Sequence, residues 1–300
     1  MPAKKIFPPR VALGIAIVAV STASVFIRYA QADAPSLTIA AYRLGLAALI
    51  LLPLAWLRYG REFLGLKAGD WLWALASGVF LAAHFAAWIT SLEYTTVASS
   101  VVMVSTSPLW VALAARLFLK EPLPPRLLAG LALAMAGSIV ISFAETRSGI
   151  SSRPLLGNAL ALAGALAVSG YWLIGRRLRR QISLIPYVTM VYGFAALTLL
   201  AAALLLRQPL TGFKTSTYGW FLLLALLPQL LGHSSFNWAL KHLPAAYVAV
   251  AAMGEPVGAA FLAYLLLGET PQLLKVIAAG VILAGIFLAL RRRPGESGNT

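Results

Sequence analysis

Residues 107–137 read SPLWVALAARLFLKEPLPPRLLAGLALAMAG, and residues 255–285 read EPVGAAFLAYLLLGETPQLLKVIAAGVILAG. Each stretch is a long apolar segment with a proline near its start, an acidic break, and a second apolar segment that ends at a glycine. A shift of 148 residues aligns identical residues, among them Pro108 and Pro256, Glu121 and Glu269, and Gly137 and Gly285. The internal repeat predicts two similar halves, residues 1–148 and 149–293, followed by a polar tail, 294–300, that we expect to be disordered.

The composition is far from that of a soluble domain. Of the 300 residues, 60% are hydrophobic and 11% are charged, whereas soluble domains carry about 25% charged residues. The net charge of +15 could attract nucleic acid or anionic lipid, but Lys and Arg lie in short loops between apolar runs, which is typical of a topology signal. We therefore expect a lipid bilayer, and no nucleic acid, as a partner. The absence of cysteine excludes disulfides and thiolate chemistry.

The apolar runs have the length of membrane-spanning helices, since a bilayer core of about 30 Å takes roughly 20 helical residues to cross. Ten such runs are present, at 11–30, 36–57, 71–91, 97–119, 126–144, 155–175, 186–206, 218–240, 245–267 and 272–290. Most of the 24 Lys and Arg residues lie on the side of both termini, which predicts cytoplasmic termini. Five spans per half is an odd number, so the second half should be inverted. The sequence therefore predicts an all-α integral membrane protein of ten transmembrane helices in two five-helix inverted repeats.

The N-terminus also imitates a cleavable signal peptide. Basic residues are followed by an apolar run and then by Ala30-Gln31-Ala32. The uninterrupted apolar run 11–27 is long for a signal peptide, however, and Arg28 is unusual directly before a cleavage site. We expect this segment to be the first membrane span.

Proline occupies equivalent positions in the fourth and ninth runs, at Pro108 and Pro256. Proline removes a backbone hydrogen bond and interrupts a helix. One interpretation is a packing kink; the other is a pair of broken helices that line a substrate site, as inverted-repeat transporters use them.

Glu255 is the only acidic residue well inside an apolar run. A charged carboxylate there costs about 2.5–3.5 kcal/mol unless it is paired, hydrated or protonated. It is a candidate for proton coupling or for binding a cationic group of a substrate. The alternative is a carboxylate that caps a helix start.

Polar side chains recur at helical spacing on the third and eighth runs, and such stripes must face the bundle because lipid cannot satisfy them. Each residue alone could make an interhelical hydrogen bond; together they predict a cavity with aromatic and adaptable walls. The predicted cavity residues are Tyr42, His84, Trp88, Met103, Ser107, Trp172, Gln229, His233, Asn237, Trp238 and Glu255. Arg28 and Arg43 are expected to extend toward the membrane surface, with binding of a substrate carboxylate as the alternative.

The repeat pattern resembles a known family. Two halves that each carry a proline-bearing helix, a short Glu loop (LKEPLPP at 119–125, LLGETPQ at 266–272) and a glycine-containing helix look like the drug/metabolite transporter superfamily, EamA branch. Within it, the chain resembles bacterial exporters of the YddG type, which export aromatic amino acids and related compounds. The resemblance covers essentially the whole chain. It implies a central cavity lined by the first four helices of each half, with the fifth and tenth helices peripheral.

These observations predict a secondary transporter of a bacterial inner membrane, monomeric or homodimeric, that exports small amino-acid-like solutes by alternating access. Export of drugs or other metabolites is the alternative within the same superfamily, and proton coupling and facilitated diffusion both stay open. The chain has no Walker A motif, so ATP is not expected to drive transport. An intramembrane enzyme is the remote rival: the three histidines form no His-Glu-x-x-His pattern and no intramembrane carboxylate pair is present, so no metal or cofactor is expected.

Overall fold

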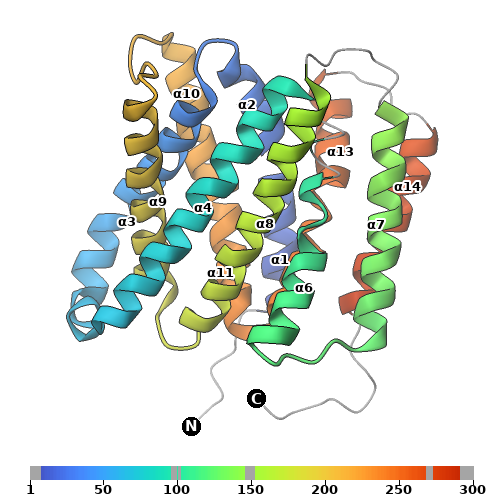
Figure 1. Cartoon of the computed structure of the whole chain (residues 1–300), viewed down its shortest axis with the longest axis horizontal. Helices are drawn as coiled ribbons and strands as arrows, with labels where there is room; N and C mark the ends of the chain where they lie inside the picture. Colours follow the sequence, from blue (N-terminus) through green and yellow to red (C-terminus); the bar gives the residue numbers. More distant parts are fainter. Residues whose placement is uncertain (1–7, 96–99, 101–102, 146–152, 268–272, 291–300) are drawn as a thin grey trace.

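The computed structural model describes residues 8–95, 100, 103–145, 153–267 and 273–290. These residues form helices joined by short connections (Figure 1). The helices of the first half are α1 Pro9–Val20, α2 Ala23–Gln31, α3 Ser36–Gly65, α4 Ala68–Tyr94, α6 Ser107–Phe118 and α7 Pro125–Glu145. Those of the second half are α8 Pro154–Leu178, α9 Leu184–Leu205, α10 Thr215–Leu224, the π-helix η2 Ala225–His233, α11 Ser234–His242, α12 Ala245–Ala252, α13 Glu255–Leu267 and α14 Leu273–Leu290.

The chain is a multi-pass membrane protein. Among the described residues, six helical segments are long and apolar enough to cross a membrane: Pro9–Gln31, Ser36–Gly65, Ala68–Tyr94, Leu155–Leu178, Leu184–Leu205 and Thr215–His242. Shorter apolar helices occupy Ser107–Phe118, Pro125–Val140, Ala245–Ala259 and Val276–Leu290. The shorter helices fall within the other four predicted spans, parts of which lie outside the described residues. Ten spans thus stay a prediction, and the predicted tail 294–300 lies outside the described residues.

Proline marks where many of these helices begin. Pro9, Pro125 and Pro154 are each the first residue of a helix, where the missing N–H has no helical partner to lose and the fixed φ angle suits the helix. Pro108 and Pro256 are the second residues of α6 and α13. The proline positions therefore explain why apolar runs of similar composition divide where they do.

Each helix of the first half packs against one of the second half. The strongest contacts pair α4 with α8, α3 with α9 and α7 with α14, while α1 packs on η2 and α11, and α6 packs on α8 and α12. The two halves therefore interleave around a common core. The α7/α14 pair lies at one side of the bundle (Figure 1) and contacts the remainder mainly through α12.

The two ends of the described chain lie together. The side chain of Arg10, at the start of α1, donates a 2.7 Å hydrogen bond from Nη2 to the carbonyl oxygen of Leu290, the last residue of α14. This contact agrees with termini on one side of the membrane.

Candidate functional site

Three helix interruptions meet at a central cavity in the described part of the chain. α1 gives way to α2 at Ser21–Thr22, a turn at Ser105–Thr106 precedes α6, and α12 gives way to α13 at Met253–Gly254. The second and third interruptions are 148 residues apart, so they occupy equivalent positions of the repeat. Residues on each side of all three interruptions line the cavity: Val20, Ala23, Val104, Ser105, Ser107, Ala252, Met253, Glu255 and Pro256.

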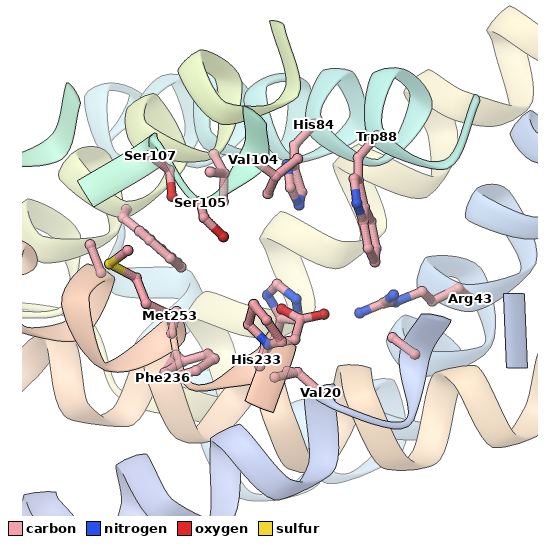
Figure 2. A pocket seen from close by; sticks show the side chains of 17 residues that line it. Val20, Arg43, His84, Trp88, Val104, Ser105, Ser107, His233, Phe236 and Met253 are labelled. Atoms are coloured by element: carbon pink, nitrogen blue, oxygen red, sulfur yellow. The ribbon is translucent and has the colours of Figure 1, made fainter. Parts of the chain in front are cut away.

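The rest of the wall comes from helices that pack around the interruptions. α3 contributes Arg43, α4 contributes His84 and Trp88, α8 contributes Val168 and Trp172, η2 ends in His233, and α11 and α12 contribute Phe236 and Ala249. Figure 2 shows the side chains of Arg43, His84 and Trp88 directed into this space. The cavity has a volume of about 60 Å³, far below the roughly 300–1,000 Å³ of typical small-molecule pockets. A solute as large as an amino acid would enter only if the surrounding helices moved apart.

Arg43 is buried in the wall, with 1% of its surface exposed. Its Nε donates a 2.8 Å hydrogen bond to Oε1 of Gln229, and its guanidinium carbon lies 4.1 Å from the centre of the Phe85 ring. A cation over an aromatic face is attracted by the ring quadrupole. These two contacts hold the guanidinium group in place and direct its terminal nitrogens toward the cavity (Figure 2).

The two histidines of the wall are held differently. His84 Nδ1 is 2.9 Å from the carbonyl oxygen of Gly164 in α8; since a carbonyl only accepts, Nδ1 carries the proton and Nε2 is left to accept in the neutral ring. The His84 ring lies nearly parallel to Trp88, with ring centres 6.0 Å apart. His233 packs edge-on against Phe85 at 5.3 Å. The wall therefore combines aromatic surfaces with polar ring atoms.

Several polar atoms of the wall have no partner. Trp88 Nε1, Trp172 Nε1, His233 Nδ1 and Arg43 Nη1 are buried without a hydrogen bond in the described structure. Buried polar atoms in proteins are nearly always hydrogen-bonded. Four such atoms around one cavity indicate that a polar molecule, water or solute, completes their hydrogen bonding.

Glu255 is the first residue of α13 and lines the cavity. Its backbone oxygen accepts a 3.2 Å hydrogen bond from Ser21 Oγ, which ties the first interruption to the third. Its carboxylate forms no hydrogen bond or ion pair with any other described residue. A carboxylate at a helix N-terminus is stabilised by the helix dipole, and this one also faces the cavity.

The structure separates the predicted cavity residues into two groups. His84, Trp88, Ser107, Trp172, His233 and Glu255 line the cavity together. Tyr42, Met103, Gln229, Asn237 and Trp238 do not. The Tyr42 hydroxyl donates to the carbonyl oxygen of Leu210 at 2.9 Å; the carbonyl oxygen of Met103 accepts from Thr106; and Trp238 contacts His242, with ring centres 4.3 Å apart.

Gln229 and Asn237 lie behind the wall, where other side chains hold their amide groups. The expectation that Gln229, His233 and Asn237 share one face assumed an α-helix, but Gln229 and His233 belong to the π-helix η2. Gln229 accepts from Arg43, whereas the Asn237 amide donates to the hydroxyls of Tyr171 and Tyr192.

Arg43 is the main residue whose position differs from the expectation. Its burial shows that it does not extend to the membrane surface, while Arg28 on α2 is exposed. Arg43, Phe85 and Gln229 come from three separate helical segments, α3, α4 and η2. The signal in the sequence was a cation seven residues inside an apolar run, the same kind of signal that singled out Glu255.

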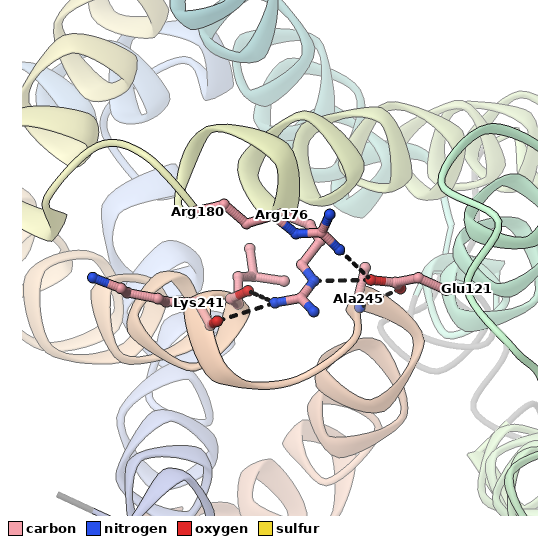
Figure 3. Close-up of polar contacts among 6 residues, drawn as sticks. Glu121, Arg176, Arg180, Lys241 and Ala245 are labelled. Carbon is pink, nitrogen blue, oxygen red and sulfur yellow. Dashed lines mark hydrogen bonds and ion pairs between the residues drawn. The ribbon is translucent and has the colours of Figure 1, made fainter. Parts of the chain in front are cut away.

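An ionic cluster around the buried Glu121, in the α6–α7 connection, joins the two halves (Figure 3). Glu121 Oε1 accepts from Arg176 Nε at 2.9 Å and from Arg180 Nη2 at 3.4 Å, and Glu121 Oε2 accepts from the backbone N–H of Ala245 at 3.3 Å. Arg176 Nη1 also donates to the carbonyl oxygens of Leu240 and Lys241. The carboxylate lies at the N-terminus of α12 and the guanidinium group at the C-terminus of α11, so each matches the sign of a helix dipole.

A smaller contact joins the halves at the opposite end. Asp33 Oδ2 accepts from the backbone N–H of Lys214 at 2.8 Å and from Thr217 Oγ1 at 2.7 Å, at the start of α10. The hydrogen bond from the Lys214 backbone, followed by that from Thr217, holds the pKa of the half-buried Asp33 carboxyl below its ordinary value. The cavity thus lies between two sets of contacts that each tie the halves together.

Comparison with known proteins identifies related chains along the whole length. The profile of the EamA-like transporter family matches residues 11–143 and again residues 155–291. An uncharacterized transporter of Archaeoglobus fulgidus is 26% identical over 274 residues, which is 90% of this chain and 92% of the relative. The uncharacterized transporter YyaM of Bacillus subtilis (strain 168) is 21% identical over 253 residues, 83% of each chain. A solved structure described only as the crystal structure of a protein superposes with a TM-score of 0.78 at 20% identity, over 94% of this chain and 96% of the other.

Proposed function

We propose that this chain, which belongs to the EamA-like transporter family and is a membrane transporter, exports small amino-acid-like solutes, aromatic amino acids among them, through the central cavity. The observation that carries this proposal is the composition of the cavity wall. Trp88 and Trp172 offer aromatic surfaces, while unpartnered polar atoms lie beside them. Solutes with one apolar and one polar end suit such a wall.

The proposal includes a topology of ten spans in two inverted five-helix repeats, residues 1–148 and 149–293, with both termini in the cytoplasm of a bacterial cell. Its support is the equivalent placement of the interruptions before α6 and α13 and the pairing of helices across the halves. The excess of Lys and Arg on the side of the termini supports the orientation.

Transport by alternating access requires the two ends of the cavity to open in turn. The Glu121–Arg176 cluster would break to open one end, and the Asp33 contacts with Lys214 and Thr217 would break to open the other. In the structure both sets of contacts are formed and the cavity is small.

Counterflow in liposomes that contain only this protein tests the proposal. The liposomes are loaded with unlabelled tryptophan or phenylalanine and are given the labelled amino acid outside, with and without a pH gradient. Saturable uptake without a gradient establishes an aromatic-amino-acid facilitator, and uptake only with a gradient establishes a proton-coupled one. If neither occurs, aromatic amino acids are not the substrates, and cationic drugs and other metabolites are tested in the same liposomes.

Glu255 is the proposed coupling residue if uptake depends on pH. Its carboxylate faces the cavity and can exchange a proton with water or solute there. Glu255→Gln keeps the size of the side chain and removes the exchangeable charge. We expect the pH dependence of net flux to be lost while exchange between the two sides continues. An unchanged pH profile in well-folded Glu255→Gln protein would exclude this role.

A further inference from the structure

Resting on the proposed function, we infer that Arg43 is the binding residue for the carboxylate of the solute, so that the cavity selects solutes with an acidic group. Arg43 reaches this site from α3, in the second turn of the helix, and is one of the residues that line the cavity. Glu255 lines the same cavity from the start of α13. The wall therefore carries one cation and one anion, each from a different half of the chain.

The first argument is the hydrogen bonding of the guanidinium group. Only Nε has a partner among the described residues, Oε1 of Gln229, and Nη1 is buried without one. A guanidinium group has five N–H donors in a rigid fork that fits a carboxylate with two parallel hydrogen bonds. Gln229 and Phe85 hold one side of the group, which leaves the terminal nitrogens for a ligand in the cavity (Figure 2).

A second buried arginine shows what a purely structural guanidinium group looks like in this protein. Arg179 has 2% of its surface exposed, and it donates from Nε to the carbonyl oxygen of Asn237 and from Nη1 to that of Ile182. Its donors are used by backbone carbonyls of α11 and of the α8–α9 connection. Arg43 is as deeply buried, but no backbone carbonyl accepts from its guanidinium group and its Nη1 has no partner among the described residues. This difference indicates a binding site for an anionic ligand.

The charge opposite Arg43 extends the inference to the other end of the solute. Glu255 and Arg43 do not form an ion pair, although both line the cavity. A solute with a carboxylate and an ammonium group can lie between them, with the carboxylate at Arg43 and the ammonium group at Glu255. The alternative is that Arg43 only neutralises Glu255 and never touches the solute.

Three ligands that share one phenyl ring distinguish these roles. Phenylalanine carries both charged groups, phenethylamine lacks the carboxylate, and 3-phenylpropionate lacks the ammonium group. Their dissociation constants are measured by titration calorimetry with the purified full-length protein. Because hydrogen bonds to charged groups contribute about 1.5–3 kcal/mol, we expect phenethylamine to bind wild-type protein at least roughly tenfold more weakly than phenylalanine.

Arg43→Gln removes the charge and the fork. It should weaken phenylalanine and 3-phenylpropionate at least roughly tenfold and leave phenethylamine unchanged or tighter. Arg43→Lys keeps the charge without the two-pronged geometry, so we expect a smaller loss with the same ligand order. Arg28→Gln is the matched control, since Arg28 is exposed on α2 and does not line the cavity; it should leave all three constants unchanged.

The remaining outcomes bear on the Arg43 site, on the proposed substrate class, or on both. Wild-type protein that binds phenethylamine as tightly as phenylalanine overturns the carboxylate site and leaves transport of aromatic solutes standing. Equal weakening of all three ligands in folded Arg43→Gln protein shows a counter-ion role and also overturns it. Binding of 3-phenylpropionate without phenylalanine keeps the Arg43 site and overturns the amino-acid substrate class. No binding of any ligand overturns both. If Arg43→Gln does not fold, the wild-type ligand order and Arg43→Lys decide.

Discussion

The α7/α14 pair and the central cavity are both made of apolar helices, but they differ in the continuity of those helices and in their buried polar atoms. Between α7 and α14, glycines bring the two backbones together: a Cβ atom on Gly130 would lie 2.5 Å from the carbonyl oxygen of Gly285 and 2.7 Å from the amide nitrogen of Ala289. Around the cavity, helices are interrupted instead, and polar atoms of Arg43 and His233 stay without partners.

This difference separates packing from binding within one membrane fold. Lipid tails are as apolar as leucine, so helices associate through close van der Waals packing, which small residues permit. The α7/α14 contact has this character. Glycines also pack closely beside the cavity, Gly232 against Val20 and Gly258 against Ser21, but the cavity in addition keeps unsatisfied hydrogen-bonding groups at an energetic cost. Substitutions in the first region should therefore change stability, and substitutions in the second should change which solutes are transported.

The largest expected effect comes from adding one methyl group between α7 and α14. In Gly130→Ala, the new Cβ meets backbone atoms that cannot rotate away, so we expect a loss of about 3 kcal/mol, the upper end for overpacking. Thermal unfolding of the purified protein in detergent measures it. Gly280→Ala on α14 is the control, because nothing lies within 4 Å of its added Cβ. Equal stability of the two variants would contradict the close contact of these helices.

Two variants with effects of intermediate size, one behind the cavity wall and one in it, test where the cavity ends. Asn237→Ala removes the amide that donates to Tyr171 and Tyr192, so we expect a loss of about 1–2 kcal/mol in stability with unchanged solute preference. His84→Ala removes an aromatic ring from the wall and should change the preference for aromatic over aliphatic solutes by about two- to tenfold. Counterflow competition and thermal unfolding are measured on both variants. A changed preference in Asn237→Ala alone would reverse this assignment.

The smallest effect is expected at Tyr42. Tyr42→Phe removes the hydrogen bond to the carbonyl oxygen of Leu210 and keeps the ring stacked on Phe221, whose centre is 4.6 Å away. We expect a loss of about 0.5–1.5 kcal/mol in unfolding free energy and no change in solute preference. A change in preference would show that Tyr42 reaches the solute in another conformation of the transport cycle.

Much of the architecture could be predicted from the order of residues. Six of the predicted spans coincide with helices long enough to cross a membrane, and the prolines at 108 and 256 stand directly after interruptions of equivalent position. These features depend on local properties, namely hydropathy over about 20 residues and the missing N–H of proline. The family could be predicted for the same reason, because its motifs are contiguous. The number of spans beyond these six, the orientation and the substrate stay predictions.

The cavity wall could be predicted only in part. His84, Trp88 and Glu255 stood out because polar groups inside apolar runs are rare, and the structure brings them together. Gln229 accepts from Arg43 behind the wall, and it lies in a π-helix, Ala225–His233, for which the spacing of residues contains no clear signal. Apolar wall residues such as Val20 and Met253 resemble any other core residue in the sequence.

What the sequence by itself determined is the membrane location, most of the helices, the internal repeat and the family, because each follows from the chemistry of neighbouring residues. Only the tertiary structure decided which polar groups share one space. Arg43, His84, His233 and Glu255 come from segments up to 212 residues apart, and their meeting depends on the packing of the two halves across one another. In a loop, Arg43 would be one more basic residue. Here it is buried beside the cavity and its Nη1 has no hydrogen-bond partner, which makes it the candidate carboxylate site that the three ligands test.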